Sequence, residues 1–299
     1  MRACAKVWFS LGFVLILLGG ILFTGVMSSL DWDFTRLSTV SYETESYVFE
    51  ESFSRISLHT DTADVLFVSS EDGICRVECY KPETEEYSVS VAEGTLSVRE
   101  TTEKSWQIGI DFSSPTITVY LPQREYDSLA VNGSTGDIEL PQNFSFGNVH
   151  VSLSTGDIRV ENVSAGSMEL SVSTGRVNAL GVDCAGDLTV HVSTGDVYLT
   201  DISCHNLKSS GNTGDLSLRN VLAKAAFTFV RTTGDIRFDG CDAEEVFVET
   251  DTGDVAGSLL SGKVFVTETS TGKIDVPKTT DGGRCEVKTS TGDIQLYIQ

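Results

Sequence analysis

The chain has 299 residues and a formal net charge of −22 at pH 7, because 43 aspartates and glutamates outnumber 21 lysines and arginines. A surface this acidic repels nucleic acid and anionic lipid headgroups. We therefore expect no nucleic-acid partner. The four histidines form no cluster when the repeats described below are aligned, which argues against a zinc site or a Ser-His triad.

The N-terminal segment is hydrophobic. Arg2 and Lys6 precede an apolar run at residues 7–27, and Asp31 and Asp33 follow it. A helix of this length spans about 30 Å, enough to cross a bilayer and longer than the apolar part of a cleavable signal peptide. The basic flank favours a cytoplasmic N-terminus. We predict a single-pass protein of the cell membrane, with a cytoplasmic tail at 1–6, a transmembrane signal anchor at 7–27 and an extracellular C-terminal domain. A processed signal peptide is the alternative.

Two less regular segments follow. Residues 28–45 are polar and are predicted to form a tether. Residues 46–133 contain alternating apolar and polar runs, among them ISLHTDTADVLFV around Ala63 and YSVSVAEGTLSVRE with a Glu-Gly turn. We predict an irregular β region here that starts and caps the repeats.

From residue 134 on, the chain repeats itself. The motif STGDI occurs at 134–138, 154–158 and 290–294, and looser copies place Thr-Gly pairs at steps of 19 or 20 residues. Such a period is typical of a solenoid. The glycines, which we predict to be structural turns, are Gly136, Gly156, Gly175, Gly195, Gly214, Gly234, Gly253, Gly272 and Gly292.

Within each repeat, hydrophobicity alternates. The second residue after every glycine is aliphatic, as in Ile138 and Val177, and a second alternating run such as MELSVS precedes the next glycine. A period of two indicates strands, and no helical period occurs in the array. We therefore predict an all-β fold, a β-solenoid with coils of about 19–20 residues over residues 134–299, preceded by one transmembrane helix.

The residue after the glycine is aspartate in seven of the nine copies, the exceptions being Arg176 and Lys273. Turn chemistry is the favoured interpretation, because aspartate side chains accept hydrogen bonds from turn amides. In sequence order, Arg176 lies between Asp157 and Asp196, and Lys273 between Asp254 and Asp293. No basic residue interrupts Asp196, Asp215, Asp235 and Asp254, so a divalent-cation ladder on these four carboxylates is the alternative. We expect no other cofactor.

Cysteines recur in register. Cys184 and Cys204 both lie nine residues after their repeat glycine, which would stack them about 4.8 Å apart and allow a disulfide. Cys241 and Cys285 occupy apolar columns and are predicted to be core residues.

An N-terminal anchor, the strand VYLP ahead of the array and serial STGDI coils together resemble the bacterial putative-adhesin family of membrane-anchored β-strand-repeat proteins, a domain of unknown function. The resemblance covers residues 54–299. It implies a β-solenoid at the cell surface, some relatives belonging to envelope-stress operons, and it brings no catalytic residue.

No catalytic set stands out, because the outward column three residues after the glycine holds no acid-base pair. We predict a non-catalytic surface interaction module for an unknown protein or cell-envelope ligand. A structural, self-assembling scaffold is the alternative, since the final GDIQLYIQ would leave Leu296 and Ile298 on an open edge strand. An enzyme acting on polysaccharides is a remote third interpretation.

Overall fold

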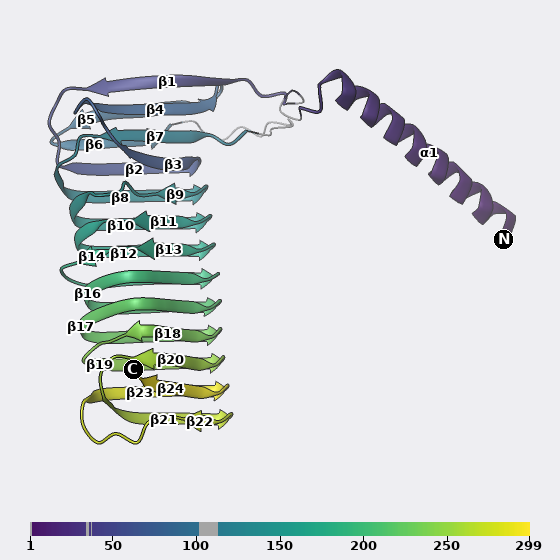
Figure 1. Cartoon of the computed structure of the whole chain (residues 1–299). Helices are drawn as coiled ribbons and strands as arrows, with labels where there is room; N and C mark the ends of the chain where they lie inside the picture. The colour runs from purple at the N-terminus through teal and green to yellow at the C-terminus, as the bar shows by residue number, and fades with distance from the viewer. Residues whose placement is uncertain (1, 34–35, 37, 102–112) are drawn as a thin grey trace.

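The computed structural model describes residues 2–33, 36, 38–101 and 113–299. Met1 of the predicted tail, residues 34, 35 and 37 of the predicted tether, and residues 102–112 of the predicted irregular region lie outside the described residues. The described residues form one long helix and a rod of stacked β-strands (Figure 1).

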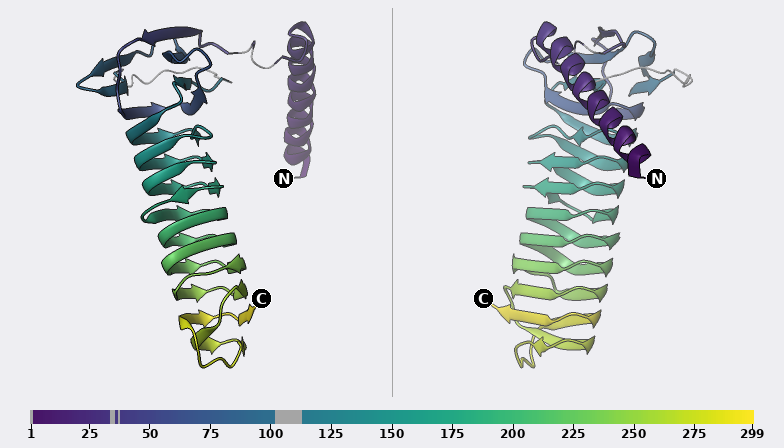
Figure 2. Two further views of the ribbon diagram at one scale, coloured as in Figure 1. Left: turned by 60° about the vertical axis from the view of Figure 1, so that its left-hand side comes forward. Right: turned by 90° about the vertical axis from the view of Figure 1, so that its right-hand side faces the viewer.

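The helix α1 covers Arg2–Ser29. Its segment Leu11–Ser29 has a mean hydropathy of 2.3 and, within the described chain, is the one helical segment long and apolar enough to cross a membrane. Its apolar side chains are exposed, Phe9 by 82% and Ile16 by 72%, because α1 stands apart from the rod (Figures 1 and 2). A membrane anchor and a signal sequence both have these properties.

The rod has two main walls of parallel strands that meet at the Thr-Gly turns (Figures 1 and 2). Each coil gives the first wall one strand before its glycine and the second wall one strand after it. Stacked from the helix end, the first wall contains β2 (Arg55–Thr62), β8 (Glu125–Thr135), β10 (Ser145–Thr155), β12 (Ser164–Thr174), β15 (Leu188–Thr194), the later parts of β16 (Val197–Thr213) and β17 (Leu216–Thr233), β19 (Glu245–Thr252), β23 (Gly283–Thr291) and β21 (Lys263–Thr271).

The second wall follows the same stacking order. It contains β3 (Asp64–Ser69), β9 (Ile138–Glu139), β11 (Ile158–Glu161), β13 (Val177–Leu180), the first parts of β16 and β17, β18 (Ile236–Cys241), β20 (Val255–Leu259), β24 (Ile294–Ile298) and β22 (Ile274–Asp275). The short β14 (Asp183–Cys184) lies between the walls in sequence and pairs with β12 and β16.

The core is a set of apolar columns between the walls. Val149 of β10 pairs with Met168 of β12, and Val151 pairs with Leu170, so the alternating pattern keeps the same face inward in every coil. These four side chains are at most 2% exposed. The predicted β-solenoid with a spacing of about 20 residues is therefore confirmed.

The end nearest α1 is closed by antiparallel strands. β6 (Thr95–Glu100) and β7 (Thr116–Leu121) pair with β2 and β3 on the side opposite the array. β4 (Cys75–Pro82) then pairs antiparallel with β7, β1 (Tyr42–Phe49) with β4, and β5 (Tyr87–Ala92) with β6. β1 begins at Tyr42, before the predicted tether ends at Glu45.

The far end does not stack in sequence order. The last coil, β23 and β24, lies between the coil of β19 and β20 and the coil of β21 and β22 (Figure 1). The prediction that GDIQLYIQ leaves Leu296 and Ile298 on an open edge is wrong in part: β24 pairs with β20 along its length and with β22 at Ile294 and Gln295, and Leu296 is only 3% exposed. The outermost strands of this end are β21 and β22.

Candidate functional site

The turn glycines hold the coils at close spacing. Eight of the nine repeat glycines, all but Gly272, have φ between +129° and +156°, a region that residues with a side chain rarely adopt. A Cβ on Gly195 would lie 1.9 Å from the carbonyl oxygen of Gly175 in the coil before it. Glycine is therefore needed at these turns both for its backbone conformation and for the close contact between turns.

The aspartates after the glycines form a hydrogen-bonded column, here called the aspartate ladder. Oδ1 of each ladder aspartate accepts the backbone amide of the equivalent residue in the next coil, at 2.7–2.9 Å. The donor and acceptor pairs are Asp137 and Asp64, Asp157 and Asp137, Arg176 and Asp157, Asp215 and Asp196, Asp235 and Asp215, Asp254 and Asp235, Asp293 and Asp254, and Lys273 and Asp293. These are the contacts with turn amides that the sequence interpretation favoured.

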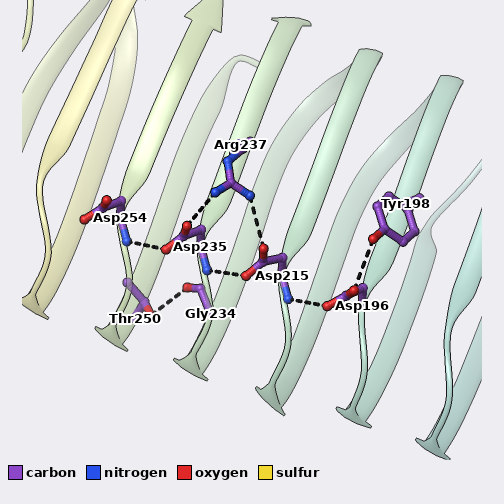
Figure 3. A network of polar contacts seen from close by, with 8 residues as sticks. All are labelled: Asp196, Tyr198, Asp215, Gly234, Asp235, Arg237, Thr250 and Asp254. Atoms are coloured by element: carbon purple, nitrogen blue, oxygen red, sulfur yellow. Dashed lines mark hydrogen bonds and ion pairs between the residues drawn. The ribbon is translucent and has the colours of Figure 1, made fainter.

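Figure 3 shows the four aspartates proposed as a cation ladder, together with the partners of their outer oxygens. Arg237 donates to Oδ2 of Asp235 at 2.6 Å and to Oδ2 of Asp215 at 3.1 Å. Tyr198 donates its hydroxyl to Oδ2 of Asp196 at 3.1 Å. Three of the four carboxylates thus use both oxygens within the protein.

The pKa values of Arg237 and Tyr198 are both raised by these contacts. The hydrogen bond to Asp215 is the main cause that raises the pKa of Arg237, so the guanidinium keeps its charge beside the ladder. The hydrogen bond to Asp196 raises the pKa of Tyr198, because the hydroxyl is held as a donor to a carboxylate. The sequence interpretation missed both residues. Each lies two residues after an aspartate, the spacing that puts side chains on one face of a strand.

The stacking order also changes the ladder. Lys273 does not lie between Asp254 and Asp293, as predicted from the sequence order, because the coil of Gly292 is inserted before that of Gly272. The uninterrupted aspartates therefore extend to a fifth residue, Asp293. Arg176 does lie beside Asp157, where its guanidinium makes an ion pair at 3.2 Å.

In the described part of the chain, no group of three or more His, Cys, Asp or Glu side chains is arranged to hold a metal ion. Stacked carboxylates repel each other by about 1 kcal/mol in water. Hydrogen bonds from backbone amides, Arg237 and Tyr198 to the carboxylate oxygens offset this repulsion. The ladder is thus arranged to join coils, and the cation ladder stays a prediction.

The sequence pattern of the Toastrack DUF4097 family matches residues 53–186 and 182–299. The chain belongs to the Toastrack DUF4097 family. This confirms the resemblance found in the sequence, and the two matched segments together contain the array and the irregular β region from residue 53 on. The family is a domain of unknown function, which supplies no catalytic assignment.

Solved structures share the Toastrack fold. A "putative lipid binding protein" from Parabacteroides distasonis is 11% identical, with a TM-score of 0.55, and the match covers 87% of this chain and 98% of that one. A "putative adhesin" from Bacteroides fragilis is 13% identical, with a TM-score of 0.48, covering 86% of this chain and 97% of that one. At such identities the likeness concerns the fold alone. No curated protein matches the chain in sequence.

The six cysteines in the rod of this Toastrack chain, from Cys75 to Cys285, are buried free thiols. Cys184 and Cys204 align in one column, as predicted, but no disulfide joins them. Their Sγ atoms point to different neighbours, because Cys184 contacts the carbonyl oxygens of Gly166 and Asp187, whereas Cys204 contacts that of Leu222. Cys241 and Cys285 are both 0% exposed, in agreement with the core positions predicted for them.

A shallow hollow of about 660 Å³ lies where the chain crosses over to β21. Lys263, only 2% exposed, lies at its wall and donates to Asp242 at 2.7 Å and to the hydroxyl of Ser261. Its ammonium group thus already forms an ion pair within the protein. This contact favours a structural role for Lys263, holding the crossover in place, over a role in ligand binding.

Proposed function

We propose that this chain is a membrane-anchored surface module without catalytic activity, in which α1 spans the membrane and the rod projects outside the cell. The observation that carries the proposal is one exposed apolar helix joined to one end of a rod of stacked strands (Figures 1 and 2). The basic residues Arg2 and Lys6 before α1, and the acidic residues Asp31 and Asp33 after it, support a cytoplasmic N-terminus.

Several features support an interaction role over catalysis. The chain belongs to a family without an assigned reaction, and some proteins of the same fold are named adhesins. The ladder carboxylates, the most regular polar groups of the rod, are bonded within the protein. The rod therefore offers columns of exposed side chains on rigid walls, which is how solenoids bind protein or cell-envelope ligands.

Membrane anchoring can be tested by expressing the full chain in a bacterium and extracting its membranes with alkaline carbonate. The expected result is a chain of 32.3 kDa that stays in the membrane pellet. A shorter chain in the soluble fraction would instead indicate that the N-terminal segment is a cleaved signal peptide, and it would overturn the anchor.

A further inference from the structure

The coil of β21 and β22, here called the tip coil (residues 263–276), leaves the core of the rod open. β21 pairs with β23 and β22 with β24, and among the described residues no strand pairs with their outer edges. Ile274 is 45% exposed, whereas its equivalent in the neighbouring coil, Ile294, is 0% exposed, because no further coil covers the tip. Phe265 and Val276 pack on the core but are only partly buried.

The chain itself covers little of this end. The loop after β22 returns to β23, and Thr279 donates its hydroxyl to the carbonyl oxygen of Lys263, at the beginning of β21. Ile274 lies further along the tip coil. An open strand edge above an apolar core is a surface that pairs with another strand edge.

The charge of the tip coil differs from that of the rest of the chain. The tip coil and the loop after it, residues 263–282, contain three lysines, Lys263, Lys273 and Lys278, and three acids, Glu268, Asp275 and Asp281, so this segment has no net charge. The whole chain carries −22, which makes two copies repel along their sides. The tip is therefore a surface on which a second copy can approach without that repulsion.

A second copy also offers the matching structure. Its tip coil presents the same unpaired backbone groups and the same open core, so contact between tips continues the coil-on-coil packing of the rod. Two copies meeting in this way are related by a two-fold axis, which sets their edge strands antiparallel.

We propose that the tip coil is a homotypic contact surface through which the rods of two copies join end to end. The inference rests on the proposed function in one respect: if α1 is anchored, the tip points away from the membrane, because α1 is joined to the rod at the end opposite the tip (Figure 1). Copies in facing membranes then meet tip to tip, which makes the contact an adhesive one.

Clustering of vesicles tests this surface. The full chain is reconstituted into neutral lipid vesicles, protease digestion confirms that rods face outward, and vesicle size is followed by light scattering. We expect clustering of vesicles that all carry the chain. Ile274→Lys should abolish it, since a lysine charge placed on the open apolar end weakens the contact by about tenfold or more. Val230→Lys is the matched control, because Val230 is 37% exposed in the middle of the rod and should leave clustering unchanged.

The outcomes separate the alternatives. Absence of clustering by the native chain, or equal clustering by Ile274→Lys with an unchanged melting temperature, overturns the homotypic contact. Clustering of chain-bearing vesicles with empty ones indicates a lipid partner and overturns it as well. Because reconstitution sets the orientation of the rod, this experiment can fail while the membrane anchor stands, and carbonate extraction can fail while tip contact stands.

Discussion

Oδ1 of Asp215 accepts the backbone amide of Asp235 at 2.9 Å, so that the carboxylate of one coil closes the turn of the next. Arg237 then joins the outer oxygens of the same two residues. The carboxylate-to-amide hydrogen bond repeats from coil to coil along the ladder. We therefore expect the ladder to contribute to the stability of the rod.

Asp215→Ala should lower the free energy of unfolding by about 1.5–3 kcal/mol, because it removes a charged acceptor from an amide and from Arg237. Asp215→Asn should cost less, since it keeps one oxygen acceptor. Denaturant unfolding of the full chain measures both. Asp251→Ala, at an exposed position of the same rod, is the control and should change stability by less than about 0.5 kcal/mol. Equal effects of Asp215→Ala and Asp251→Ala would show that the ladder hydrogen bonds do not stabilise the rod.

Calcium should not stabilise the rod. Asp196, Asp215 and Asp235 use both carboxylate oxygens for protein donors, so a hard cation finds too few ligands without breaking those bonds. The expected melting temperature is the same with chelator and with millimolar calcium. A rise of several degrees, lost in Asp235→Asn, would restore the cation ladder.

Gly195→Ala should destabilise the rod by more than the cost of holding alanine at positive φ, because its methyl group would also clash with the neighbouring turn. Its Cβ would lie 1.9 Å from the carbonyl oxygen of Gly175. Gly240 also has positive φ, +63°, but a Cβ there would meet only Gln299, at 3.9 Å, so Gly240→Ala should cost about 1–2 kcal/mol. Thermal melting of the two variants compares strain with and without the clash. A cost for Gly195→Ala no larger than for Gly240→Ala would contradict close stacking of the turns.

The buried thiols should make stability fall at alkaline pH. Burial raises the pKa of Cys204 and of Cys285 to about 12, from an ordinary value of 9.0. Between these values the unfolded chain ionises while the folded chain stays protonated, so stability is fully present below pH 9 and decreases as pH rises toward 12. Each thiol contributes at most about 1.4 kcal/mol per pH unit.

Urea unfolding at pH 8 and pH 10 measures this slope. Cys204→Ala and Cys285→Ala should each make it shallower. In the native state a thiol reagent at pH 8 should leave both residues unmodified, and an unfolded sample should react. Rapid reaction of the folded chain would show that these cysteines are accessible.

The coil, its two strands and the inward columns could be predicted from the sequence, because these depend on local period and on turn glycines. The order of the last coils could not. β21 and β23 have the same alternating pattern, so periodicity cannot say which of them packs on β19. Longer-range contacts decide: the observed order places Lys288 between Glu249 and Glu268, whereas sequence order would stack the two glutamates.

The candidate site was predicted only in part for a related reason. Alignment on the glycines finds every aspartate of the ladder except Asp64, which follows Ala63, since the others share one column. Arg237 and Tyr198 occupy a different column, whose members vary from coil to coil, so their contacts with Asp235 and Asp196 follow from side-chain reach and not from the repeat.

The most direct test of the central claim, that the rod lies outside the cell on a membrane anchor, is labelling of Thr252→Cys on intact cells with a membrane-impermeant maleimide. Thr252 is exposed, and the six cysteines from Cys75 to Cys285 are buried, so the native rod provides an unlabelled control. The account predicts that Thr252→Cys is labelled on intact cells and that native Cys4 is labelled only after permeabilisation. Labelling of Thr252→Cys only after permeabilisation would contradict it.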